Sequence, residues 1–128
     1  SLLAIAGSTA ILSRKESRDW TYSRHVAEAL YALMDQKNLT HDLYNITSGM
    51  PWSVEEWCKC LAKTFPEFQY RFARAGEQTN VDLFGDRDRV TMSSEKLTSD
   101  TGYELSKNIP EIYNNFEKWI LSSREFWK

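Results

Sequence analysis

The chain has 128 residues, of which 41% are hydrophobic and 13% aromatic, the size and composition of one globular domain with a substantial core. Its formal net charge of -2 leaves no broad basic surface, which excludes a general attraction to nucleic acid or anionic lipid. No stretch approaches the roughly eighteen apolar residues needed to span a bilayer, and residues 1–12 lack the basic start of a secretory signal. We therefore expect a soluble, cytoplasmic protein with no nucleic-acid or membrane partner.

Two features concern the extent of the chain. It begins with Ser1 rather than Met and enters an apolar run at once, which hints at a fragment, although the remnant of an expression tag would explain Ser1 equally well. No low-complexity tract, internal repeat or long linker rich in proline, glycine and serine interrupts the sequence. We therefore predict a single domain over residues 1–128.

The first predicted elements are a strand and a helix. Trp20 and Tyr22 alternate with polar neighbours over 18–24, which indicates a short strand. Apolar residues after it then recur at the spacing of one helical face. These positions are Val26, Ala29, Leu30, Leu33 and Met34.

A second short strand and a well-defined helix follow. The strand is indicated over 43–46 and ends at the Ser-Gly turn signal of 48–49. Ser53 and Glu56 have the spacing of a capping box, which predicts a helix that begins there and ends before Pro66. One stripe of this helix is apolar, formed by Val54, Trp57, Cys58, Leu61, Ala62 and Phe65.

The rest of the chain predicts one more strand, a loop and two helices. Residues 68–72 alternate as in a strand with one buried face, and 76–90 are charged and without periodicity, which is typical of a loop. A short helix over 94–100 should stop at Gly102, and a final helix should begin near Pro110. Its apolar face consists of Ile112, Phe116, Trp119 and Ile120. The fold class is therefore α+β, a small mixed domain with three or four short strands and four or five helices.

Several familiar catalytic patterns do not occur in the sequence. The five glycines stand too far apart to form G-x-G-x-x-G or a phosphate-binding loop, so no cofactor site is predicted within the chain. Cys58 and Cys60 have no further cysteine to complete a zinc site, and we interpret them as packing residues in a reducing compartment. His25 and His41 lack a second metal ligand at helical spacing. We predict that each is a surface or capping residue, and that the chain contains neither a metal site nor a catalytic base.

Residues 103–107 match Y-x-x-x-K, the spacing at which a helix aligns a tyrosine with a lysine that lowers its pKa. Tyr103 follows the helix-ending Gly102, however, and Lys107 precedes the next helix. The two residues should therefore lack helical register, and we predict no catalytic role for them.

A family resemblance begins with residues 18–29, which read RDWTYSRHVAEA. Three further motifs follow in order: YNITSG at 44–49, SVEE at 53–56, and SEKL at 94–97 with a Gly-Tyr pair at 102–103. Together, in this order and over most of the chain, they resemble the C-terminal part of the extended short-chain dehydrogenases/reductases. This family includes NAD(P)-dependent nucleotide-sugar epimerases and dehydratases.

The resemblance implies that the chain is the substrate-binding region of such an enzyme, without the Rossmann half that binds NAD or NADP and supplies the catalytic tyrosine. In this family an arginine of the first motif faces the diphosphate of the nucleotide sugar, and a second arginine from a late loop joins it. Arg18 matches the first, and Arg87 and Arg89 are candidates for the second. A guanidinium suits the role because its planar fork binds two phosphate oxygens at once. The expected partners are a nucleotide-sugar substrate and the missing Rossmann domain.

Two departures from the family pattern bear on these residues. The family aspartate before V-A-x-A is His25 here, which would alter the capping of that helix. The second family arginine precedes Gly-Asp, whereas the Gly-Asp pair at 85–86 precedes both candidates. An ion pair with a nearby carboxylate is therefore an alternative role for Arg18, and pairing among 86–89 is an alternative for the loop.

A different interpretation is a free-standing α+β interaction or ligand-binding module, anchored to its partner by exposed tryptophans such as Trp52 or Trp127. If the chain is instead part of a larger enzyme, it should expose apolar surface where the other half docks, mostly from residues 1–12. Association through that surface would produce a homodimer. The sequence leaves the choice among epimerisation, dehydration and reduction open.

Overall fold

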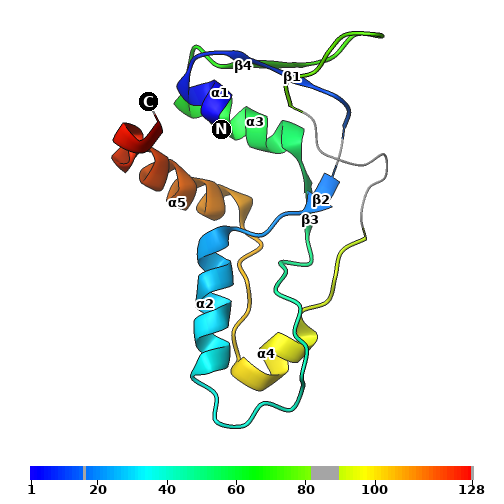
Figure 1. Ribbon diagram of the computed structural model, residues 1–128, viewed down its shortest axis with the longest axis vertical. Coiled ribbons are helices and arrows are strands. Elements are labelled where there is room, and N and C mark those ends of the chain that lie inside the picture. The colour runs from blue at the N-terminus through cyan, green and yellow to red at the C-terminus, as the bar shows by residue number, and fades with distance from the viewer. Residues whose placement is uncertain (16, 82–89, 128) are drawn as a thin grey trace. The chain divides into compact units, whose positions relative to one another are not determined.

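A computed structural model describes residues 1–15, 17–81 and 90–127 (Figure 1). Its elements in chain order are α1 (Leu2–Ile5), β1 (Thr9–Leu12), β2 (Ser17–Asp19), α2 (Ser23–Met34), β3 (Pro51–Ser53), α3 (Val54–Thr64), β4 (Gln69–Phe72), α4 (Glu95–Thr101), α5 (Ile109–Ser122) and the 3-10 helix η1 (Arg124–Trp127). Four short strands and five α-helices in the described residues confirm the predicted small mixed α+β fold. None of the helices found there is long and apolar enough to cross a membrane.

The described residues group into two compact units. Unit 1 draws on Ser1–Ser17, Ser53–Asp88 and Tyr113–Lys128, and unit 2 draws on Arg18–Trp52 and Arg89–Ile112. Each unit therefore combines segments that are far apart in the sequence. That the whole chain is one C-terminal substrate-binding region stays a prediction.

The sheet of unit 1 is a parallel pair, β1 and β4, which lie side by side in Figure 1. Thr9 is opposite Gln69 and Leu12 is opposite Phe72. Ala10 and Leu12 are both buried, as expected for alternate positions of a strand with one face in the core. Parallel strands need a long crossover between them, and α3 lies within that connection.

Asn80 completes the hydrogen bonding of β1. Its Nδ2 donates to the Thr9 carbonyl at 2.9 Å, and its Oδ1 accepts from the Ile11 N–H at 2.7 Å. The N–H groups of Asn80 and Val81 donate to the Ile11 carbonyl as well, so the backbone and the side chain of this segment together satisfy polar groups of the β1 edge.

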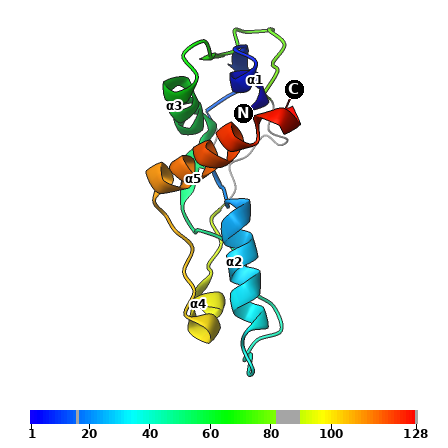
Figure 2. The same cartoon turned by 90° about the vertical axis from the view of Figure 1, so that its left-hand side faces the viewer.

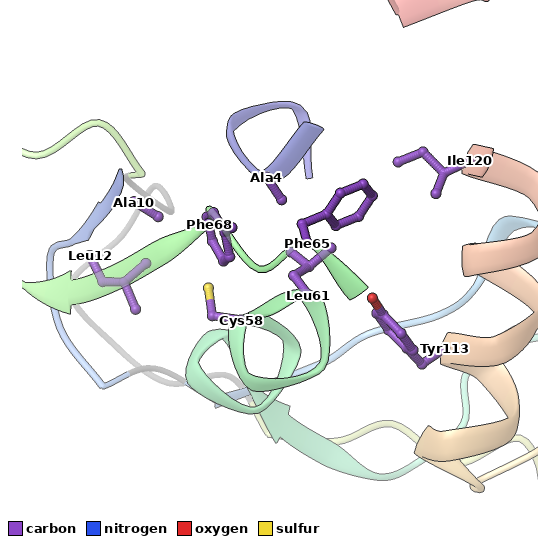
Figure 3. Close-up of a cluster of buried hydrophobic side chains, with 9 residues drawn as sticks. All are labelled: Ala4, Ala10, Leu12, Cys58, Leu61, Phe65, Phe68, Tyr113 and Ile120. Carbon is purple, nitrogen blue, oxygen red and sulfur yellow. The ribbon is translucent and has the colours of Figure 1, made fainter. Parts of the chain in front are cut away.

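The core of unit 1 is a cluster of apolar side chains from α1, β1, α3 and α5, with Leu61 and Phe65 in its middle (Figure 3). Its buried members are Ala4, Ala10, Leu12, Cys58, Leu61, Phe65, Phe68, Tyr113 and Ile120. Burial of this apolar surface is the main stabilising contribution to unit 1.

Local signals determine where α3 begins and ends. Ser53 Oγ accepts from the Glu56 N–H at 3.2 Å, and Glu56 Oε2 accepts from the Ser53 N–H at 2.6 Å, which confirms the predicted capping box. The helix ends at Thr64, because the residue before a proline is disfavoured in the helical conformation; Phe65 is extended and Pro66 follows.

Unit 2 has a smaller apolar core between α2 and α4, which lie side by side in both views (Figures 1 and 2). Ala29, Leu97 and Leu105 are its buried members, and Leu33, Tyr44, Ile46 and Tyr103 pack against them. The glycine that ends α4 is confirmed: Gly102 has φ +70°, a left-handed conformation that favours a residue without a side chain.

The face of α2 differs from the predicted one. Its buried residues are His25 and Ala29, whereas Leu30 is 49% exposed and Met34 is 84% exposed. The buried face therefore follows positions 25, 29 and 33, because α4 and Tyr103 pack on that side of the helix.

The strand predicted over 43–46 is wrong. Exposed and partly buried residues do alternate there, but no strand in the described part of the chain pairs with these residues. Tyr44 and Ile46 pack into the core of unit 2 instead, and the next strand is β3, at Pro51–Ser53.

The expectation that residues 1–12 supply an exposed docking surface stays a prediction: three residues of this segment are buried, and the others are partly buried or exposed. The segment forms α1 and β1, whose Ala4, Ala10 and Leu12 are buried in the core of unit 1; Leu2, by contrast, is 60% exposed. Several large apolar side chains of α2 and of the residues after it are exposed, namely Leu30, Tyr31, Met34, Leu39 and Leu43.

Replacement of Leu61 by Ala should lower the free energy of unfolding by about 2–5 kcal/mol, because it removes a fully buried side chain and leaves a cavity. Leu2→Ala is the matched control, since this leucine is 60% exposed and lies in the same unit. Urea unfolding followed by tryptophan fluorescence measures both. Equal stabilities of the two variants would contradict the described core.

Candidate functional site

Arg18, the predicted substrate-binding residue, is the middle residue of β2 (Ser17–Asp19), which pairs with β3. The strand is shorter than predicted because α2 already begins at Ser23, with Tyr22 as its N-cap. Arg18 is partly buried. Asp19, the next residue of the strand, is also partly buried, and its contacts fix the position of the strand that contains Arg18.

The Asp19 carboxylate accepts hydrogen bonds from two segments that are far apart in the sequence. One segment supplies the hydroxyls of Thr47 and Ser48, the latter at 3.1 Å from Oδ1. The other supplies the Met92 N–H, at 3.4 Å from Oδ2. Thr47 and Ser48 are 1% and 5% exposed, so their hydroxyls have little access to water and need protein acceptors. The sequence pattern does not indicate this network, in which the aspartate of the RD motif bridges distant segments.

The turn that follows Thr47 is organised by the same hydroxyls. The Gly49 N–H donates to Thr47 Oγ1 at 3.1 Å, and the Met50 N–H donates to Ser48 Oγ at 3.3 Å. Gly49 has φ +66°, and a Cβ there would lie 3.4 Å from the Met92 carbonyl oxygen. Glycine is therefore favoured by the left-handed backbone, whereas the Met92 carbonyl would be in ordinary van der Waals contact with a Cβ.

Trp20 and Trp52 fix β2 to β3 beside this network. Trp20 Nε1 donates to the Trp52 carbonyl at 3.0 Å, and the two rings meet edge to face with centroids 6.5 Å apart. Trp52 is 7% exposed. Its predicted role as an exposed anchor of an interaction module is therefore wrong, and the side chain of Trp127 lies outside what the structure describes.

Arg87 and Arg89 lie outside the described residues, and so does the proposed ion pairing within 86–89. Their predicted role in substrate binding stays a prediction. The described chain resumes at Val90, which is 89% exposed, and Met92 then binds Asp19. In the sequence, Arg89 precedes Met92 by three positions.

Tyr103 and Lys107 do not form a catalytic pair. Residues 102–107 are not helical, and Lys107 Nζ lies 3.4 Å from Glu104 Oε1. The Tyr103 hydroxyl donates to Glu28 Oε2 at 2.9 Å. Burial, together with this carboxylate, raises the pKa of Tyr103 to about 12, the opposite of the shift that a basic tyrosine needs.

The first histidine is more buried than predicted. His25 is 8% exposed and meets the ring of Tyr22 edge to face, with centroids 5.4 Å apart. It is the third residue of α2, and the N-cap Tyr22 makes no side-chain capping hydrogen bond. This helix thus begins without an acidic residue in its first turn, in line with the departure from the family pattern at position 25.

The second histidine belongs to a network around Asp100, on the last turn of α4. Thr40 donates to this carboxylate through its N–H at 2.8 Å, and the Tyr44 hydroxyl donates at 2.6 Å. His41 Nδ1 lies 3.3 Å from Asp100 Oδ2. The hydrogen bonds from Tyr44 and Thr40 hold the pKa of Asp100 well below its usual range, so the carboxylate stays ionised at neutral pH. The network connects the segment after α2 to α4.

The cysteines are packing residues, as predicted. Cys58 is buried in the core of unit 1 and Cys60 packs against it, and burial raises the pKa of both thiols. Within residues 1–15, 17–81 and 90–127, no group of three or more His, Cys, Asp and Glu side chains could hold a metal ion.

No protein-family model and no curated protein matches the chain. Solved structures do match it, along nearly its whole length. MoeE5 in complex with UDP-glucuronic acid and NAD is 21% identical over 95% of this chain and 40% of its own, with a TM-score of 0.69. The epimerase Mth375 of Methanothermobacter thermautotrophicus is 19% identical over 98% of this chain and 36% of its own, with a TM-score of 0.70.

A third similar structure is the Bordetella bronchiseptica enzyme WbmF in complex with NADH, 17% identical over 98% of this chain, with a TM-score of 0.71. At these identities the similarity establishes the fold. This chain spans only 36% to 40% of the length of these three proteins. The chain therefore has the fold of one part of these larger proteins.

Tyr103 should ionise only at very high pH. With a pKa of about 12, Tyr103 should be a phenolate in roughly a tenth of the molecules at pH 11. The difference in phenolate absorbance between wild type and Tyr103→Phe measures the fraction, and circular dichroism shows that both proteins are folded. Tyr31→Phe is the control, because Tyr31 is 72% exposed and lies in the same unit. A midpoint for Tyr103 below that of Tyr31 would restore the Y-x-x-x-K pair as a candidate base.

Proposed function

We propose that this chain is the substrate-recognition part of an NAD(P)-dependent epimerase, dehydratase or reductase that acts on a nucleotide-activated sugar. The main support is the match over 95% of the chain to a protein in complex with both UDP-glucuronic acid and NAD, of which this chain spans only 40%. The whole activity then requires residues beyond those of this chain, which is catalytically incomplete by itself.

The cofactor should bind to the residues that this chain lacks relative to MoeE5 and WbmF. Its five glycines form no glycine-rich cradle for a dinucleotide, and Tyr103 has the wrong pKa and the wrong partner for a catalytic base. When NAD or NADP is bound there, it supplies hydride transfer. The residues of this chain bind and orient the sugar nucleotide. The two free cysteines suit a reducing compartment, and we place the enzyme in the cytoplasm.

Substrate recognition is proposed to rest on arginine. UDP sugars such as those bound by MoeE5 contain a diphosphate, and a guanidinium binds two phosphate oxygens in one plane. Arg18 lies in a strand fixed by Asp19 and by the two tryptophans, and Arg87 and Arg89 precede the segment that Asp19 also binds. We assign all three to the diphosphate.

Arg18→Ala in the full-length protein should weaken binding of UDP by roughly ten- to a hundredfold, because a hydrogen bond to a charged group contributes about 1.5–3 kcal/mol. Lysine should recover only part of the loss, since it keeps the charge without the fork. Free sugar should bind equally well to both proteins. Calorimetric titration measures the affinities, and thermal melts show that the variants are folded.

Arg24→Ala is the matched control. Arg24 is also in unit 2, but its Nε lies 3.8 Å from Glu28 and its side chain is 64% exposed, so this pair contributes little to stability. Its removal should leave UDP binding unchanged. Equal affinities of wild type and a folded Arg18→Ala would remove Arg18 from the site and favour the ion-pair role instead.

The 128-residue chain alone should bind neither NAD nor NADP and should turn over no nucleotide sugar, because it has no glycine-rich cradle. Calorimetry with both cofactors tests this, and micromolar affinity would contradict it. The native reading frame upstream of Ser1 offers an independent check. It should encode a further domain of roughly 150 residues that contains a strand followed by G-x-x-G-x-x-G.

A further inference from the structure

We propose that Asp19 is a positioning residue of the substrate site, holding the turn at 47–50 and the segment from Met92 against the strand that contains Arg18. The inference rests on the proposed function of Arg18 and adds a residue that does not itself touch the substrate. A carboxylate is an unsuitable ligand for a diphosphate, because like charges repel. Its contribution must therefore come through other groups.

The hydrogen bonds around Asp19 have a fixed direction. An ionised carboxylate only accepts, so the hydroxyls of Thr47 and Ser48 must donate to it. Their oxygens are then available to accept the N–H groups of Gly49 and Met50, at 3.1 and 3.3 Å. Asp19 thus binds the two side chains that organise the turn, and the Met50 carbonyl is a second, longer acceptor for Ser48 Oγ at 3.5 Å.

The same carboxylate joins this turn to the segment that ends the late loop. Met92 N–H donates to Asp19 Oδ2 at 3.4 Å, and Asn45 Nδ2 donates to the Ser93 carbonyl at 3.2 Å. In the sequence, this segment comes directly after the loop that contains Arg87 and Arg89. Asp19 therefore connects the strand of Arg18 to the end of that loop.

The variant Asp19→Asn tests whether Asp19 acts by positioning other groups. The amide has nearly the same shape, but its Nδ2 is a donor, so it can accept bonds at only one of its two terminal atoms. Oδ2 of Asp19 accepts from both the Thr47 hydroxyl and the Met92 N–H, and Oδ1 accepts from the Ser48 hydroxyl. With the amide nitrogen at one of these two positions, either the Ser48 hydroxyl or both other donors lose their acceptor. In the full-length protein, UDP affinity should fall by roughly tenfold or more, the effect of losing a hydrogen bond to a charged group.

Asp100→Asn is the matched control for a general loss of stability. Asp100 is likewise a carboxylate of unit 2 that accepts from a backbone N–H and a side-chain hydroxyl, those of Thr40 and Tyr44. The Asp100→Asn variant should have a lower melting temperature and an unchanged affinity for UDP. An equal loss of affinity in Asp100→Asn and Asp19→Asn would assign Asp19 a merely structural role and overturn the proposal.

A double-mutant cycle with Arg18 provides the deciding measurement. If Asp19 acts by placing Arg18, then Asp19→Asn should have a clearly smaller effect on UDP affinity when Arg18 is already Ala. Full additivity of the two losses overturns the positioning role. Wild-type UDP affinity in Asp19→Asn, with Arg18→Ala still weakened, overturns this inference alone. Failure of wild type to bind UDP instead overturns the proposed function.

Discussion

The geometry of unit 2 depends on a partly buried carboxylate that can only accept hydrogen bonds. Asp19 is in a three-residue strand, too short to be stable by its own backbone pairing. Its acceptor sites are used by donors from two remote segments. Two of these donor residues, Thr47 and Ser48, are almost fully buried. An unsatisfied buried hydroxyl would cost free energy, so the strand, the turn and the segment at Met92 are ordered together.

The two units are stabilised by different interactions. Unit 1 has a continuous apolar cluster around Leu61, and hydrophobic burial of this kind is non-directional. Unit 2 has a smaller apolar cluster with Ala29, Leu97 and Leu105 as its buried members, and adds the networks on Asp19 and Asp100. Hydrogen bonds are directional, so these networks specify positions of the chain that a small apolar core would leave loosely defined.

What could be predicted from the sequence was local. The box of Ser53 and Glu56 and the left-handed Gly102 involve residues a few positions apart, and both were found where expected. The strand at 43–46 and the buried face of α2 depend on partners distant in the sequence, which periodicity does not report. The same distinction applies to the candidate site. The RD motif pointed to Arg18 as a candidate site residue, whereas no sequence pattern predicted that Asp19 accepts hydrogen bonds from distant segments.

A position beside such a network is favourable for an arginine that binds an anion. When Arg18 binds the diphosphate as proposed, its long side chain loses considerable rotamer freedom, and a fixed backbone avoids a further loss. Asp19 is the nearest acidic residue to Arg18 in the sequence. Hydrogen bonds from Thr47, Ser48 and the Met92 N–H use acceptor sites of its carboxylate. These bonds order the turn and the segment at Met92 beside the strand that contains Arg18.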